Sequence, residues 1–483
     1  MPAVGTPDDT ICAIATPSGE GGIGIVRISG QHAVDVASHI VRLRSNRSLH
    51  GVASHKLHLA DILVPPMPSL PSWSTSTTSH SAEEIVDEAL VVYMKAPRSF
   101  TAEDVVEIHC HGNGFVLQRV CEACVAAGAR FAQAGEFTKR AFLNGRLDLS
   151  QAEAVLDTIK AKSDFSLKLA QRQLRGELAE QVHRLRTRLV GVLAHLEAGI
   201  DFTGEDIEFL GRDEMIVSLR ETSDEVRRML ATAETGRLLR DGVRVVIAGE
   251  PNVGKSSLLN RLLHENRAIV TDIPGTTRDV IEESVVWQGL RVTLVDTAGI
   301  RDTTDLVELE GIRRSKEAQD QADIVLHVMD GTRPATIDLV NLRQPSAGPK
   351  HVLVINKVDL LPADAVQRLA DDFPGCTGCK VLHISVRTGE GLEGLKEAIR
   401  AQCITPSFES IDDVMITRLR HRVALERAGV ALKETLTSID EGLEPEFVAV
   451  DLREAADALG EIVGVISSDE VLDRIFSEFC IGK

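Results

Sequence analysis

The chain has 483 residues, of which 43% are hydrophobic and 3% aromatic, so more than one packed core is expected, each built mainly from aliphatic side chains. A formal net charge of −19 argues against a protein that acts as a basic nucleic-acid clamp over its whole surface. No apolar run approaches the roughly 20 residues of a membrane span, the N-terminus lacks the features of a secretory signal, and the eight cysteines are scattered, so a cytoplasmic protein without a membrane partner is expected.

The first 148 residues predict an α/β domain. Strand patterns occupy 11–15, 23–28, 85–93 and 104–109, and helical patterns occupy 31–43 and 114–127. Residues 65–81 are rich in Pro, Ser and Thr, which can neither form a strand ladder nor bury much surface. We interpret this segment as a flexible surface loop.

The rest of the chain predicts two helical stretches that flank a second α/β region. Residues 149–240 have helical periodicity, as the spacing of Leu178 and Val182 illustrates, and residues 404–483 are similar. Residues 241–403 alternate between strand and helix patterns. The simplest interpretation is an all-α domain interrupted by an inserted α/β domain, so that the two helical halves pack together across the insertion.

The inserted region begins with a phosphate-binding motif. A strand pattern at 243–248 runs into GEPNVGKS, which ends at Ser256 and is followed by helix-forming residues. This is the G-x-x-x-x-G-K-[ST] phosphate loop in its strand–loop–helix context. Its glycines let backbone N–H groups turn toward phosphate oxygens, and the helix N-terminus adds its dipole. Lys255 can place its charge on the β and γ phosphates, and the Ser256 hydroxyl can ligate Mg²⁺.

Later strand patterns end in motifs that complete a guanine-nucleotide site. D-T-A-G follows 292–295, N-K-V-D follows 352–355 and S-V-R follows 382–384, with another strand pattern at 324–329. The Asp359 carboxylate can accept hydrogen bonds from two N–H groups of guanine, a pair that adenine lacks, so the site favours GTP and GDP. The predicted nucleotide contacts are Asn252, Val253, Gly254, Lys255, Ser256, Ser257, Thr271, Asp272, Ile273, Pro274, Gly275, Thr276, Thr277, Asp296, Thr297, Ala298, Gly299, Asn356, Lys357, Asp359, Ser385, Val386 and Arg387.

The residue after the D-T-A-G motif is unusual for a GTP-hydrolysing protein. Many GTPases place a Gln there to orient the attacking water, but this chain has Ile300, which cannot do so. Glu308 or Glu310, in the acidic segment that follows, could reach in instead; the same segment could equally be a solvated acidic loop. No arginine finger is evident, so a monovalent cation or a partner subunit would have to supply that charge.

Several longer segments resemble the tRNA-modification GTPase family MnmE, also called TrmE. They are ATPSGEGGIGIVRISG, SFTAEDVVEIHCHGN, GEFTKRAFLNGRLDLSQAEAV, GEPNVGKSSLLN, DIPGTTRDV, DTAGIR and the terminal FCIGK. The resemblance implies an N-terminal domain that binds folate and mediates homodimerisation, and a Ras-like G domain inserted in a helical domain. It also implies a heterotetramer with the FAD protein MnmG, which modifies C5 of the wobble uridine of certain tRNAs by aminomethyl or carboxymethylaminomethyl addition. The expected one-carbon donor is 5-formyl- or methylene-tetrahydrofolate.

The same resemblance assigns roles to single residues. Lys255, Thr277 and Glu308 match the catalytic residues, and Glu308 would orient the water that Ile300 cannot. Hydrolysis is expected when two G domains meet and K⁺ replaces an arginine finger. The matched Mg²⁺ ligands are Ser256 and Thr277; the matched K⁺ ligands are Asn252, Thr271, Ile273 and Thr276; and the matched folate contacts are Arg27, Glu107, Arg146 and Lys483, with Arg146 standing where relatives often have Lys.

Two other functions are compatible with these motifs. A regulatory GTPase switch in ribosome assembly would share the G motifs, although such proteins usually carry a basic RNA-binding appendage, and this chain is acidic overall. A folate-binding scaffold whose G domain only regulates assembly is the other. A preference of hydrolysis for K⁺ over Na⁺ would separate the tRNA-modifying enzyme from the switch.

Overall fold

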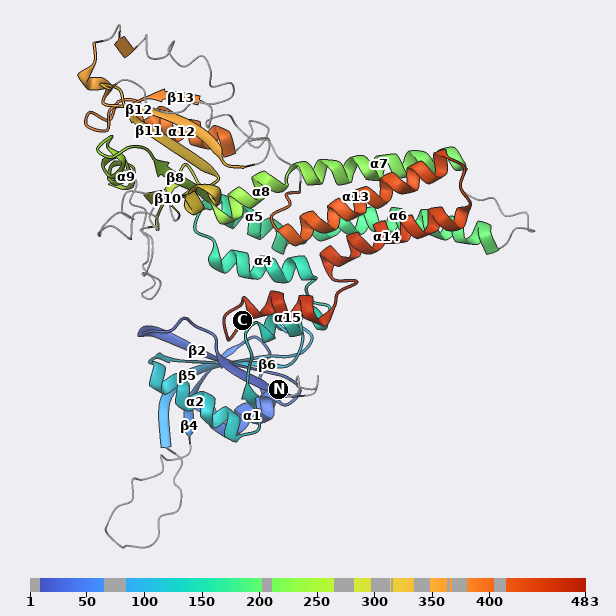
Figure 1. Cartoon of the computed structure of the whole chain (residues 1–483). Helices are drawn as coiled ribbons and strands as arrows, with labels where there is room; N and C mark the ends of the chain where they lie inside the picture. The colour runs from blue at the N-terminus through green and yellow to red at the C-terminus, as the bar shows by residue number, and fades with distance from the viewer. Residues whose placement is uncertain are drawn as a thin grey trace. The chain divides into compact units, whose positions relative to one another are not determined.

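The computed structural model describes residues 9–64, 84–201, 211–264, 282–296, 313, 316–333, 348–362, 365–366, 380–403 and 414–483 (Figure 1). The chain forms two compact units. The first comprises Met1–Leu156 with Gly460–Lys483, and the second comprises Asp157–Leu459. Among the described helices, none is both long enough and apolar enough to cross a bilayer.

The first unit is built on a seven-stranded sheet in the order β3-β4-β5-β6-β2-β1-β7. The strands are antiparallel neighbours, except that β1 pairs with β7 in parallel. Their bounds are β1 Ile11–Ile14, β2 Gly21–Ser29, β3 Val41–Leu43, β4 Leu57–Val64, β5 Glu84–Met94, β6 Val105–Gly112 and β7 Arg130–Phe131. The helices of this unit are α1 Ala33–Ile40, α2 Gly114–Ala126, α3 Glu136–Leu143 and α15 Asp469–Ser477, and α4 Leu149–Lys160 begins in it.

Helices pack on both faces of this sheet because side chains along a strand alternate between its faces. Cys12 of β1 lies in the core under α1 and α2, whereas its neighbours Ile11 and Ala13 pack with Phe137 of α3 on the other face. The α3 side continues into a cluster that includes Leu149 and residues of α15, so the C-terminal helix belongs to the first unit.

The predicted strands and the helix at 114–127 of this region are confirmed, but the helix expected at 31–43 is wrong at its end. Helix α1 stops at Ile40, and Val41–Leu43 forms β3, paired with β4. Val41 and Leu43 are buried while Arg42 is exposed, so the period is that of a strand. The loop expected at 65–81 lies outside the described residues.

The second unit contains a helical part formed by segments from both sides of an insertion. Its helices are α5 Asp164–Leu174, α6 Glu177–Asp201, α7 Arg212–Ala231, α8 Ala233–Asp241 and α13 Leu419–Asp440, and α14 Pro445–Val463 ends just beyond it. Helices α7 and α13 lie side by side (Figure 1). The predicted all-α domain with an inserted α/β domain is therefore confirmed.

The two crossings between the helical part and the insertion are held next to each other. Thr232 Oγ1 accepts a hydrogen bond of 3.0 Å from Ile416 N, and Arg240 Nη1 donates to Thr417 O at 3.2 Å. A Cβ on Gly236 would lie 2.2 Å from Ile416 O, so α8 needs glycine at this approach. Thus the insertion leaves and re-enters the helical part at neighbouring points.

The insertion is a six-stranded sheet in the order β13-β12-β11-β8-β10-β9. All neighbours are parallel except the β9–β10 hairpin. The bounds are β8 Val243–Ala248, α9 Lys255–His264, β9 Glu282–Trp287, β10 Leu290–Asp296, β11 Ile324–Asp330, β12 Lys350–Asn356, β13 Lys380–His383 and α12 Leu392–Cys403. Helices α9 and α12 cover one face and share its core with Leu169 of α5 and Leu238 of α8.

Candidate functional site

The strand order of the insertion indicates the edge of its sheet at which a ligand is expected. Strand β8 lies between β10 and β11, so the connections leaving β8 and β10 run to opposite sides. In open α/β sheets, ligands bind outside the carboxyl ends of the strands at such a switch point. The phosphate loop, Asp296, Asn356 and Ser385 all follow or end strands at this edge.

The phosphate loop between β8 and α9 depends on two glycines. A Cβ on Gly249 would lie 2.2 Å from Val328 O, and a Cβ on Gly254 would lie 2.4 Å from Asn356 Nδ2. Both have positive φ, 146° and 103°. Only glycine tolerates this backbone at these distances, so the loop can run close to two neighbouring strands.

Lys255 and Ser256 begin α9 and point their polar atoms at the loop and at β10. Lys255 is buried, and its Nζ donates to Gly249 O at 3.0 Å and Glu250 O at 2.8 Å. Ser256 Oγ donates to Asp296 Oδ2 at 2.8 Å. A hydroxyl and a carboxylate oxygen are the hard donors that Mg²⁺ prefers, so this pair fits that ion. Val253 is buried in the loop core, and Ser257 lies on the first turn of α9.

Asn356 and Lys357 tie the guanine-side motif to the phosphate loop. Asn356 Nδ2 donates to Val253 O at 2.9 Å, and its Oδ1 accepts from Val386 N at 3.1 Å. Lys357 Nζ donates to Asn252 O at 3.1 Å. These two side chains therefore connect three separate sequence motifs at the carboxyl edge of the sheet.

Asp359 is the carboxylate that the sequence predicts to read guanine. It accepts from Ser385 Oγ at 2.6 Å, and Arg387 Nη2 lies 3.0 Å from its other oxygen. Its side chain is 10% exposed, whereas that of Arg387 is 76% exposed. A carboxylate fixed by a buried hydroxyl keeps its remaining acceptor sites for a ligand.

Part of the predicted nucleotide site lies outside the described residues. The predicted site residues in that part are Thr271, Asp272, Ile273, Pro274, Gly275, Thr276, Thr277, Thr297, Ala298, Gly299 and Glu308. Of the expected K⁺ ligands, the structure therefore describes Asn252 alone, which has a left-handed backbone with φ of 65°.

Sequence reasoning missed Asp330, which ends β11 at the same edge. Its carboxylate Oδ2 lies 2.7 Å from Lys357 Nζ, and Oδ1 accepts from Thr332. An aspartate directly after a buried strand and before a glycine was the available signal, because ligand-facing residues of such sheets follow strand ends.

The first unit gathers the four predicted folate contacts in a second polar cluster. Arg27 Nε donates to Glu107 Oε1 at 2.8 Å, and its Nη1 donates to Gly482 O at 3.3 Å, next to Lys483. Burial lowers the pKa of Lys483, and the charge of Arg27 lowers it further, while Glu107 opposes the shift. The cations of this cluster suit the carboxylates of a folate, and the carboxylate of Glu107 suits the N–H groups of its amine-bearing ring.

Phe100 joins this cluster without having been predicted as a contact, and so does His109, whose alternation with Glu107 along one strand indicates a polar pocket. The guanidinium groups of Arg27 and Arg146 lie 5.4 Å and 5.3 Å from the centre of the Phe100 ring, within cation–π range. Arg146 Nη1 also donates to Phe100 O at 2.6 Å, and His109 Nε2 lies 3.3 Å from Glu107. Their signal was proximity in sequence to Glu107 and to the SFTAED segment.

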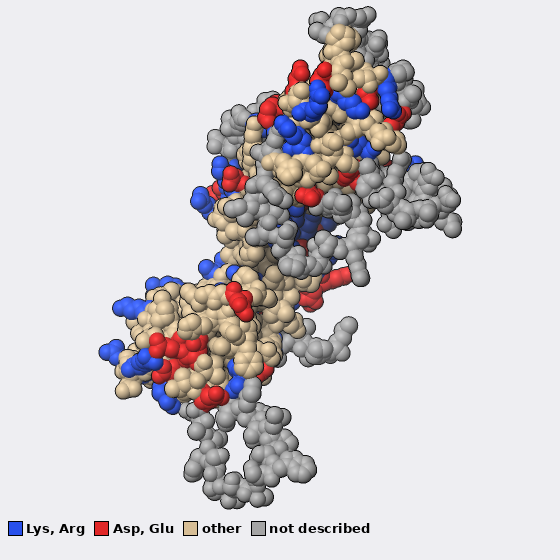
Figure 2. All heavy atoms as spheres, turned by 90° about the vertical axis from the view of Figure 1, so that its left-hand side faces the viewer, with Lys and Arg blue, Asp and Glu red and all other residues tan. Residues whose placement is uncertain are grey.

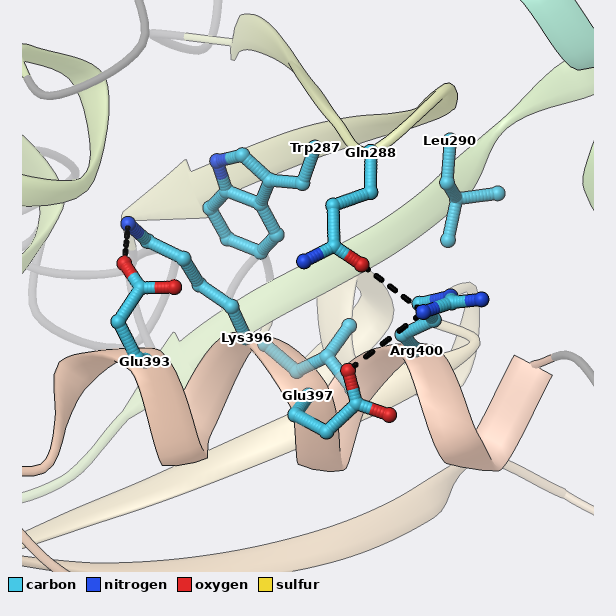
Figure 3. A pocket seen from close by; sticks show the side chains of 8 residues that line it. Trp287, Gln288, Leu290, Glu393, Lys396, Glu397 and Arg400 are labelled. Carbon is cyan, nitrogen blue, oxygen red and sulfur yellow. Dashed lines mark hydrogen bonds and ion pairs between the residues drawn. The ribbon is translucent and has the colours of Figure 1, made fainter.

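A hollow of about 230 Å³ lies at the other end of β10. It is lined by Trp287, Gln288, Leu290, Glu393, Lys396, Glu397, Ile399 and Arg400 (Figure 3). Its polar walls pair with one another: Lys396 Nζ with Glu393 at 2.6 Å, and Arg400 Nη1 with Gln288 at 2.9 Å. Strand β10 separates this hollow from Asp296 by about 20 Å at 3.3 Å per residue, so the nucleotide motifs do not line it.

Charge on the described surface is mixed. Figure 2 shows Lys and Arg side chains interspersed with Asp and Glu on this face of the part that carries the nucleotide motifs. The pattern agrees with the acidic composition and does not resemble one continuous basic tract.

Comparison with known proteins gives a consistent result for both units. Residues 10–146 match the family model "GTP-binding protein TrmE N-terminus", and residues 149–480 match "MnmE helical domain". The chain is 43% identical to the tRNA modification GTPase MnmE of Heliobacterium modesticaldum, over 98% of this chain and 99% of the relative. It is 45% identical to the protein of the same name in Symbiobacterium thermophilum, over 99% of this chain and 100% of the relative.

A solved structure with local similarity is the G domain of the T. maritima FeoB iron transporter. It has 28% identity and a TM-score of 0.24, and the match covers 34% of this chain and 99% of that one. The family assignment does not depend on it. Because the helical-domain model spans more than half of the chain and both bacterial relatives align with nearly all of it, this chain belongs to the tRNA modification GTPase MnmE family.

Proposed function

We propose that this chain hydrolyses GTP and that hydrolysis serves tRNA modification. The observation that carries the proposal is the connected edge at which the phosphate loop, Asn356 and Asp359 meet, because it joins a phosphate-binding motif to a guanine-reading carboxylate. Together with the family membership, this arrangement supports a GTP hydrolase.

Different described residues would bind the phosphates and the base of the nucleotide. The backbone of the loop from Gly249 to Gly254 and the ammonium of Lys255 bind the phosphates, and Asp359 holds the base. Ser256 and Asp296 would hold Mg²⁺, which neutralises phosphate charge when bound. Thr277 is proposed as a further Mg²⁺ ligand.

For hydrolysis we propose a K⁺-stimulated step that requires two G domains to meet. Asn252, with Thr271, Ile273 and Thr276, would bind K⁺, whose charge takes the place of an arginine finger. Glu308 would orient the water, since Ile300 cannot. The test is the GTP hydrolysis rate in K⁺ against Na⁺ at equal ionic strength, with Glu308→Gln as the variant. Equal rates in the two salts would contradict the K⁺ mechanism.

For the first unit we propose folate binding and homodimerisation by residues 1–148. Arg27, Glu107, Arg146 and Lys483 would bind 5-formyl- or methylene-tetrahydrofolate, the donor for modification of C5 of the wobble uridine with the FAD protein MnmG. The contact of Arg27 with Glu107 and its position beside Gly482 support this assignment. Titration of Arg27→Ala and Glu107→Ala with 5-formyl-tetrahydrofolate tests it, and unchanged affinity in both would refute it.

The tRNA role is tested in cells. Mass spectrometry of wobble uridines from cells lacking this protein should show loss of the aminomethyl and carboxymethylaminomethyl groups. Normal levels would instead favour a regulatory switch in ribosome assembly, which shares the same nucleotide motifs.

A further inference from the structure

Asp330 is a buried carboxylate at the carboxyl edge of the sheet that the mechanism above does not use. It ends β11, next to the phosphate loop strand β8, and its side chain is 4% exposed. A buried charge is costly unless it is paired and hydrogen-bonded, so its contacts indicate what it holds.

Both oxygens of Asp330 are occupied by donors on the same edge. Oδ1 accepts from Thr332 N at 3.0 Å and Thr332 Oγ1 at 2.7 Å, while Oδ2 lies 2.7 Å from Lys357 Nζ. Burial by itself would raise the pKa of Asp330, but the hydrogen bonds from Lys357 and Thr332 lower that pKa to about 2. The carboxylate is therefore ionised at neutral pH.

The partner ammonium reaches onward to the phosphate loop. Lys357 Nζ also donates to Asn252 O at 3.1 Å. Lys357 and Asn252 both have left-handed backbones, with φ of 66° and 65°, which L-residues adopt only where the surroundings hold them. The ammonium thus lies between a fixed carboxylate and a carbonyl of a strained loop.

We infer that Asp330 is a positioning residue for guanine-nucleotide binding, which fixes the Lys357 ammonium so that Lys357 holds the phosphate loop at Asn252. The inference rests on the proposed nucleotide site. It assigns to Asp330 no contact with the nucleotide. Its effect runs through Lys357, so loss of Asp330 disturbs the phosphate side and the base side of the site together.

The experiment measures affinity and dissociation rate of a fluorescent GDP analogue on the full chain. Asp330→Asn should weaken binding by about tenfold to a hundredfold, because it removes the charge-assisted hydrogen bond that fixes the partly exposed Lys357 ammonium. Thr332→Val is the matched control: it removes a donor to the same carboxylate but leaves Lys357 in place, and its affinity should stay near that of the unmodified chain. A loss in Thr332→Val equal to that in Asp330→Asn would mean that Asp330 only shapes the end of β11.

A double-variant cycle separates positioning from general structural damage. Since Asp330 acts through Lys357, Lys357→Met combined with Asp330→Asn should bind no more weakly than Lys357→Met alone. This comparison does not require the Asp330→Asn single variant to fold. A further tenfold loss in the combined variant would overturn the inference. If the unmodified chain itself bound no guanine nucleotide, the proposed function would fail first, which the same titration shows.

Discussion

The two units of this chain assemble their candidate sites in opposite ways. In the second unit, the described motifs of the site lie at or just after the carboxyl ends of parallel strands, so short contiguous stretches of sequence contain them. In the first unit, Arg27, Glu107, Arg146 and Lys483 come from β2, β6, the segment after α3 and the last residue of the chain. Only the tertiary fold brings them together.

This difference decides what local sequence can reveal. A parallel sheet with a switch point places residues at one edge by topology alone, so a motif after a strand already has a location. An antiparallel sheet offers no such edge. Its cluster depends on the register of Arg27 opposite Glu107 and on a backbone carbonyl 455 positions away in the chain.

The largest effect is expected at Asp359, which we propose reads the guanine base in the second unit. Asp359→Asn should weaken GTP binding by about a hundredfold or more, because an amide cannot accept both guanine N–H groups and leaves one of them unpaired. Xanthine nucleotides, which carry a carbonyl at the equivalent position, should bind the variant better than GTP does. Competition against fluorescent GDP measures both. Glu393→Gln, at an exposed side chain of α12 away from the nucleotide motifs, is the control and should have little effect.

A smaller loss is expected from crowding the phosphate loop. Gly254→Ala places a methyl group 2.4 Å from Asn356 Nδ2 on a backbone with φ of 103°, so the link between loop and base motif must shift. We expect GDP affinity to fall by about tenfold, given a strain of about 1–3 kcal/mol. Gly394→Ala in α12, where a new Cβ would meet no atom within 4 Å, is the matched control. Equal affinity for both variants would show that the close approach is unimportant.

The first unit should respond more weakly to any single change, since its cluster is held by many distant groups. Phe100→Leu removes the ring that both Arg27 and Arg146 contact, and should weaken 5-formyl-tetrahydrofolate binding about twofold to tenfold, from cation–π contacts of about 0.5–1 kcal/mol each. Isothermal titration measures it. Phe115→Leu, at an exposed ring on α2, serves as control. A loss of the same size in the control would argue against a specific role for the Phe100 ring.

The smallest expected effect is a difference between the two units in how their free energy of unfolding depends on pH. Burial, aided by the neighbouring His351, lowers the pKa of His327 to about 4. As pH falls, the His327 side chain is therefore protonated at a higher pH in the unfolded chain than in the folded chain. The free energy of unfolding should fall as pH drops from about 6.5 to about 4. In the first unit, hydrogen bonding to Asp87 raises the pKa of His111, so its contribution is present at low pH and is lost as pH rises through the folded-state pKa.

Urea unfolding across this pH range tests the contrast. His327→Gln should flatten the acid side of the curve for the second unit, and His111→Gln should leave that side unchanged for the same unit. An unaltered slope in His327→Gln would show that other groups govern the acid response.

Much of the fold could be predicted because the pattern of apolar residues in the sequence matches the buried faces of the strands and helices. The strand pattern at 243–248 coincides with β8, since a strand buried on both faces reads as a continuous apolar run. Strand β9 was missed, although the Gln288–Gly289 turn, with both φ angles positive, is the two-residue connection typical of a hairpin. Asp330 was missed because its role depends on Lys357, which only the sheet brings near.

The packing of α7 against α13 limits when this part of the chain can fold during its synthesis. During synthesis, Leu219, Val226 and Met229 of α7 emerge long before their partner helix, and the whole insertion is made in between. One cluster of the first unit is completed later still, because Leu472 and Phe476 pack with Leu149. These two contacts cannot form until the ribosome has almost finished the chain, so the apolar faces that they cover stay exposed during much of translation, when they can bind chaperones or aggregate.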